Sequence, residues 1–194
     1  KFRPLSTKEA FTALQFGEIH ILSRNVTWTQ TRDSALGVNF AGILYYDGQG
    51  FMVRRGLGVK SASGLDGAAV CVNSGSTTEL NLSDYFRPHG MKYAPVVFEK
   101  SDEVLSAYRA GRCDVFSTDQ SGLYAQRLKL AKANDHLILP EIISKEPLGP
   151  AVRQGDDKWF NIVRWTLFAL VGAEELGITK SNIEALTEKT RNPA

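Results

Sequence analysis

The sequence predicts an α/β protein of two lobes, with a two-segment hinge between them and an incomplete first lobe. Three observations carry this prediction. Apolar runs between residues 68 and 139 alternate with helix-compatible segments, a pattern typical of a parallel sheet with helices on both faces. Breaks rich in glycine or proline, near 44–48 and 144–150, enclose this region. Polar loops follow three of the expected strands, and open α/β sheets bind ligands at such strand ends.

The bulk composition excludes several classes of protein. The chain has 194 residues, of which 43% are hydrophobic and 23% charged, as in ordinary globular proteins. A formal net charge of +2 without a basic cluster argues against a nucleic-acid partner. Polar residues interrupt the most apolar stretch, 159–171, so no membrane span is expected. No signal peptide begins at Lys1, and we expect a processed or truncated piece whose precursor carried one.

The first elements belong to the first lobe. Ser6 and Glu9 have the spacing of a capping box, which starts a helix that should end near Phe16. A short strand, Ile19–Leu22, and a helix-compatible segment, Arg32–Leu36, follow. The residues that the first helix should bury are Ala10, Phe11, Ala13 and Leu14.

An extended run from Gly42 to Val53 leads into the second lobe, residues 49–147, where strands and helices alternate. The expected strands are Ala68–Val72, Pro95–Phe98, Cys113–Ser117 and His136–Leu139, and the expected helices are Thr78–Phe86, Asp102–Ala110 and Ser121–Ala131.

The chain then returns to the first lobe, which comprises residues 1–48 and 148–194. A short strand, Ala151–Arg153, precedes a long amphipathic helix from Asp157 to about Gly172. A last helix should begin at a Ser181 cap and run through Leu186. The buried stripe of the long helix should include Phe160, Val163, Leu167 and Leu170.

Three polar loops at strand ends supply groups suited to a small zwitterion. In the first loop, Thr27 and Arg32 can meet one carboxylate from two directions, because the guanidinium grips both oxygens. The second loop, 73–78, precedes a helix whose N-terminus favours an anion. The third loop contains Asp119, which can receive an ammonium group. The sequence therefore indicates a clamp in a cleft that closes on its ligand.

Cysteines and histidines give no metal-ligand spacing, so no metal site is expected. Cys71 and Cys113 lie in or beside expected strands of the second lobe. They are either free and buried, as in a cytosolic protein, or bridged, as in an exported one. Spacing alone leaves both outcomes open.

Four segments resemble the broad-specificity polar amino-acid-binding proteins of bacterial ABC importers. This family is the glutamine- and glutamate-binding branch of the periplasmic binding proteins with a two-crossover hinge. The resemblance covers essentially the whole chain, with the motifs in the family's order. The segments are Ser23–Thr29, Tyr45–Phe51, Thr118–Leu123 and Leu139–Pro150.

The resemblance implies a type II periplasmic-binding-protein fold, a periplasmic location, an inner-membrane ABC permease as partner, no cofactor and no catalysis. It implies that Arg32 holds the ligand α-carboxylate with help from Thr27, Ser76 and Thr77. The α-ammonium would contact Asp119, the backbone carbonyl of Asn25 and the Thr27 hydroxyl, while Arg24 would reach toward the ligand side chain. These proteins have first-lobe strands that this chain lacks, and the exposed sheet edge would favour self-association.

Other interpretations compete with the clamp. Arg32 could be a surface arginine, Asp119 could cap the helix that follows, and the tryptophans could be core residues. The same fold hosts lyases of the cyclohexadienyl or arogenate dehydratase type, for which Glu146 is the candidate general acid. A ligand-sensing receptor domain is the third class. The sequence favours a transport protein over both.

Overall fold

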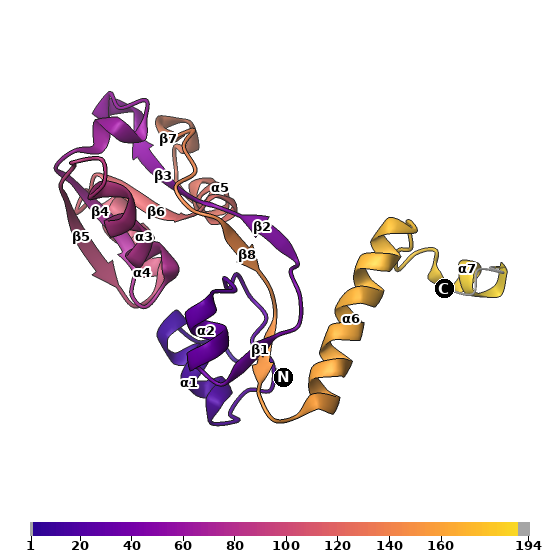
Figure 1. The fold of residues 1–194 in the computed structure, drawn as a ribbon. Helices are drawn as coiled ribbons and strands as arrows, with labels where there is room; N and C mark the ends of the chain where they lie inside the picture. Colours follow the sequence, from indigo (N-terminus) through magenta and orange to yellow (C-terminus); the bar gives the residue numbers. More distant parts are fainter. Residues whose placement is uncertain (1, 190–194) are drawn as a thin grey trace.

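The computed structural model describes residues 2–189. Figure 1 shows a part that contains a sheet and a smaller part, joined by neighbouring strands. A long helix extends outward from the smaller part. The sheet has the strand order β5-β4-β6-β3-β7. Its strands are β3 (Gln49–Arg54), β4 (Ala68–Asn73), β5 (Tyr93–Phe98), β6 (Val115–Asp119) and β7 (His136–Ile138).

The sheet is mixed, which corrects the expectation of a parallel sheet. β4 runs parallel to β5 and β6, as helical connections between successive strands require. β3 runs antiparallel to both β6 and β7. The chain enters β3 directly from the neighbouring part without a helical crossover, so nothing constrains β3 to the direction of the others.

Helices cover both faces of this sheet. α3 (Thr77–Phe86) packs on one face, while α4 (Ser101–Arg109) and α5 (Gln120–Leu128) pack on the other. Alternation along β3 sends Phe51 to the α3 side and Met52 to the opposite side. Cys71 and Cys113 form a disulfide in the core on the α4 and α5 side of the sheet, so the bridged alternative is confirmed. Short 3₁₀ turns, Arg55–Leu57, Ala62–Leu65 and Ala133–Asp135, complete this part.

Two antiparallel strands connect the parts. β2 (Tyr45–Asp47) pairs with β8 (Glu146–Leu148), so the chain leaves and returns side by side. The two passages stay together beyond this pair, because the Ile143 N–H donates to the Gln49 carbonyl at 2.9 Å. Gly149 lies against the Gly42 carbonyl, where an added Cβ would sit 2.0 Å from the oxygen, so a side chain there would separate the passages.

The smaller part is built on α1 (Thr7–Gln15), α2 (Gln30–Ala35) and the antiparallel pair of β1 (Val38–Phe40) with β9 (Ala151–Arg153). The α1 capping box and its four expected buried residues are confirmed. The expected strand Ile19–Leu22 is wrong as a strand: in this segment only Leu22 forms a bridge, with Ala151. Its neighbours on both sides are partly or fully exposed and have no strand to pair with among the described residues.

α6 (Asp157–Glu175) is one turn longer than expected. Its first turns pack on Ala41 and Val152, and the helix then extends outward (Figure 1). Val163 and Leu167 are buried, but Leu170 is 63% exposed, which corrects the predicted stripe. Trp165 is 67% exposed, so the expectation of a core tryptophan is wrong there. α7 runs from Ile183 to Lys189, and the Ser181 hydroxyl lies 2.9 Å from the Thr179 hydroxyl.

Candidate functional site

A cavity lies between the two parts, at the ends of the three polar loops. The carboxyl ends of the parallel strands β4 and β6 bring the second and third loops together, and the segment before α2 supplies the first. The structure brings together every residue predicted to bind ligand, and Arg24 with them. The cavity is lined by Thr7, Arg24, Asn25, Thr27, Arg32, Asn73, Ser76, Thr77, Thr78, Ser101, Thr118 and Asp119.

Arg32 is held in the first turn of α2, which Thr29 caps by accepting from the Arg32 N–H. Its guanidinium donates to the Thr27 carbonyl at 2.8 Å and lies over the Phe11 ring, 4.9 Å from the ring centroid. These two contacts fix the plane of the guanidinium. Among residues 2–189 it forms no ion pair with a carboxylate. Burial lowers the pKa of Arg32, and the charges of Glu146 and Asp119 act against that effect.

Asp119 ends β6 and occupies the N-cap position of α5, yet its side chain makes no capping hydrogen bond. The carboxylate is 4% exposed and accepts from the Asn25 side-chain amide at 3.0 Å. Burial raises the pKa of Asp119 from 3.8 to about 6, against the lowering effect of the Asn25 bond. A buried carboxylate with one neutral partner is suited to a cationic group.

The Asn25 side-chain amide donates to Asp119. The sequence analysis expected only the Asn25 backbone carbonyl to take part in the site, so this contact was not predicted. Arg24 donates to the Leu5 carbonyl at 3.1 Å and to the Asn25 side-chain oxygen at 3.4 Å. The Ser76 hydroxyl caps α3 and donates to the Asn73 carbonyl at 2.7 Å. Its single proton is thus already used, and ligand donors in this loop would be backbone N–H groups at the start of α3.

Glu146, named from the sequence as a candidate general acid at the second hinge, makes buried contacts that the sequence did not predict. It lies in β8 and is 1% exposed. One carboxylate oxygen accepts from the hydroxyls of Thr27 and Thr77, and the other accepts from Asn81 and Ser144. The sequence signal available was an acidic residue inside the second hinge break, with the apolar residue Leu148 two positions later.

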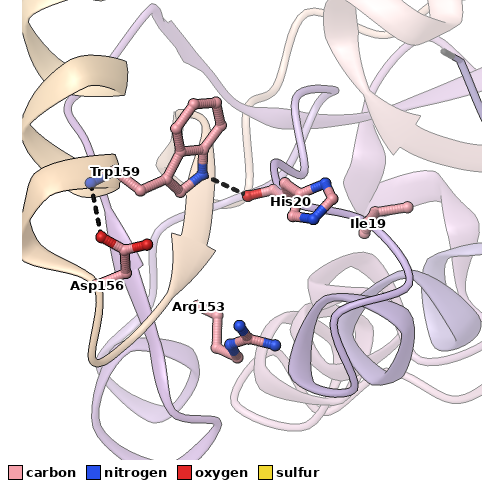
Figure 2. Close-up of a pocket in the computed structure, with 5 residues that line it drawn as sticks. All are labelled: Ile19, His20, Arg153, Asp156 and Trp159. Atoms are coloured by element: carbon pink, nitrogen blue, oxygen red, sulfur yellow. Dashed lines mark hydrogen bonds between the residues drawn. The ribbon is translucent and has the colours of Figure 1, made fainter.

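A second, separate pocket lies on the smaller part where α6 begins, and Figure 2 shows its lining residues. The Trp159 indole N–H donates to the His20 carbonyl at 2.8 Å, and its backbone N–H donates to Asp156 at 2.9 Å. The side chains of Ile19 and Arg153 complete the lining. None of the predicted binding residues belongs to this pocket.

An inserted α/β part, a two-strand connection and a polar cavity between the parts define a clamp of the type II periplasmic-binding-protein class. Solved structures share this fold. A periplasmic binding protein from Brucella ovis with glutathione bound is 58% identical, with a TM-score of 0.94, and the match covers all of this chain and 60% of that one. An ancestral arginine-binding protein bound to arginine is 25% identical, with a TM-score of 0.78 over 99% of this chain and 80% of that one.

Curated relatives are named as periplasmic or amino-acid-binding proteins. The general L-amino acid-binding periplasmic protein AapJ of Rhizobium johnstonii is 64% identical over the full chain. The glutamate/glutamine/aspartate/asparagine-binding protein BztA of Rhodobacter capsulatus is 53% identical. This chain spans 56% and 57% of those two proteins, respectively. No family model matches. Over its whole length the chain is similar to amino-acid-binding proteins of ABC transporters. No described helix is long and apolar enough to cross a membrane.

Proposed function

We propose that this protein captures polar L-amino acids in the cavity between its two parts and delivers them to an inner-membrane ABC permease from the periplasm. One observation carries the proposal: Arg32 and Asp119 line the same cavity from opposite parts of the molecule. An α-amino acid carries the two charges that these side chains complement. The names of the relatives support the ligand class and the compartment.

The capture mechanism follows from charge and placement. The Arg32 guanidinium is already oriented by Thr27 and Phe11, so it can grip a carboxylate with little further loss of side-chain freedom. Asp119 faces the ammonium from the other part. A ligand that holds both charges bridges the parts and binds the closed arrangement more tightly than an open one. That difference in affinity shifts the population toward closure.

Binding without catalysis is favoured by the surroundings of Glu146, the candidate general acid. Glu146 does not line the cavity, and both of its oxygens accept hydrogen bonds from protein donors. A general acid must hold a proton within reach of the substrate. Glu146 therefore has no proton to donate and lies outside the cavity in which a substrate would bind. The curated relatives are also named as binding proteins.

A γ-glutamyl peptide is a second candidate ligand, because the Brucella ovis relative has glutathione bound. The γ-glutamyl end of glutathione carries a free α-carboxylate and α-ammonium, so the same clamp would hold it. The rest of the peptide would then extend past Arg24 or Ser101 at the cavity lining.

Isothermal titration calorimetry with L-glutamate, L-glutamine, L-aspartate, L-asparagine, L-arginine and glutathione tests the proposal. We expect micromolar or tighter binding of at least one, and a loss of roughly 100-fold or more in Arg32→Ala, because the ligand carboxylate loses its charged partner. Arg109→Ala is the matched control, since Arg109 is exposed on α4, outside the cavity. A loss below about threefold in Arg32→Ala would remove Arg32 from the site.

A further inference from the structure

The hydroxyl groups of Thr27 and Thr77 meet at one buried carboxylate. Thr27 comes from the segment before α2, Thr77 from the first turn of α3, and both side chains line the cavity. Both hydroxyls donate to the same oxygen of Glu146, Thr77 at 3.0 Å. The two hydroxyl oxygens themselves lie 3.3 Å apart.

The opposite oxygen of Glu146 fixes the carboxylate in place. Asn81 donates to it at 2.7 Å and Ser144 at 2.5 Å. With four donors converging on it and 1% of the residue exposed, Glu146 acts purely as an acceptor. Its carboxylate cannot rotate away without leaving several buried donors unpaired.

A hydroxyl group has one proton and two acceptor lone pairs. Because the protons of Thr27 and Thr77 point to Glu146, only oxygen lone pairs remain for a ligand in the cavity. Lone pairs repel a carboxylate and accept from an ammonium. Three acceptors therefore line the cavity for the three N–H bonds of an ammonium group: the two threonine oxygens and Asp119.

We propose that Glu146 is a positioning residue that sets the ligand preference of the site: by taking the Thr27 and Thr77 protons, it makes both hydroxyls acceptors for the ligand ammonium. This inference rests on the proposed function and replaces one assignment implied by the resemblance, namely that Thr27 and Thr77 help to hold the ligand carboxylate. Thr27 and Thr77 recognise the ammonium through their hydroxyls, and the ligand carboxylate is left to Arg32 and the backbone N–H groups of α3.

The test compares L-glutamate with glutarate, which keeps both carboxylates and lacks the ammonium. Glu146→Gln puts an amide NH₂ where an acceptor was, so threonine protons turn toward the cavity. We expect glutamate affinity to fall roughly tenfold or more and glutarate affinity to stay within about threefold, measured by calorimetry or by competition. Asp84→Asn is the matched control, because this exposed carboxylate on α3 lies outside the cavity.

Thr77→Val and Thr77→Ser keep the inference testable if Glu146→Gln does not fold. Valine has the shape of threonine without the hydroxyl, and serine keeps the hydroxyl. We expect Thr77→Val to weaken glutamate selectively and Thr77→Ser to restore it. Equal losses for glutamate and glutarate, or no change, overturn the role of Glu146. A wild-type protein that binds no amino acid of the panel overturns the proposed function itself, which separates the two failures.

Discussion

Replacing Asp119 by asparagine should stabilise the unliganded protein while it removes ligand binding. Asp119 is 4% exposed, its one side-chain hydrogen-bond partner among residues 2–189 is a neutral amide, and burial raises its pKa from 3.8 to about 6. At pH 7 the carboxylate must ionise inside the fold against that preference. The difference between the folded and unfolded pKa corresponds to about 2 to 3 kcal/mol of lost stability. Asparagine keeps an oxygen for the Asn25 amide and carries no charge.

The sign of the pH effect distinguishes this cause from a change in packing. Between the unfolded value of 3.8 and the folded value of about 6, the folded protein binds more protons than the unfolded chain. The wild-type protein therefore gains stability as pH falls through 6, whereas Asp119→Asn lacks that gain. The advantage of the variant should be full at pH 7.5 and should vanish near pH 4.

Thermal unfolding followed by circular dichroism between pH 4 and 8 measures this difference. For a chain of this size, we expect Tm of Asp119→Asn to exceed that of wild type by roughly 5 to 10 °C at pH 7.5. Leu123→Ala, a buried change on α5, the helix that follows Asp119, controls for packing and should lower Tm at every pH. An Asp119→Asn Tm equal to or below wild type at pH 7.5 would refute the reasoning.

Three further outcomes are expected. Ligand affinity, measured by calorimetry, should fall up to about tenfold per pH unit below pH 6, because a bound ammonium needs ionised Asp119; a flat profile from pH 7 to 5 would contradict this. Arg32→Lys should recover only part of the Arg32→Ala loss in the same titrations, since an ammonium cannot grip two oxygens; full recovery would exclude a bidentate contact. Replacing Cys71 and Cys113 together by alanine should cost about 4 kcal/mol in urea unfolding, because the bridge closes a loop across 42 positions; wild type in reductant should match the variant.

The sequence made the cavity predictable because it placed polar loops directly after apolar strands. The ends of the parallel strands β4 and β6 lie at one edge of a sheet, so Thr77 and Asp119 come close whatever the details of packing. The helix boundaries followed from capping residues such as Ser6. The roles of these cavity residues in ligand binding remain predictions.

Other features depend on contacts between residues far apart in the chain. The direction of β3 is set by how the chain enters the sheet, and alternation of apolar residues is the same in either direction. Glu146 draws its donors from positions up to 119 residues away, which no local pattern encodes. The predicted stripe on α6 was only half right, because helical periodicity marks an apolar face without showing where a partner covers it: Leu170 remains exposed.

Gln49 and Ile143 lie next to each other, so the five-stranded part between them could be exchanged as one unit. The chain enters and leaves this part through residues joined by one hydrogen bond, so a single short peptide could reconnect the remainder. Asp119 and the start of α3 lie within this exchangeable segment, and Arg32 lies outside it. Exchanging residues 49–143 between relatives should therefore transfer Asp119 together with the backbone N–H groups of α3 and leave Arg32 and Thr27 unchanged, so that the contribution of each part to the clamp can be engineered separately.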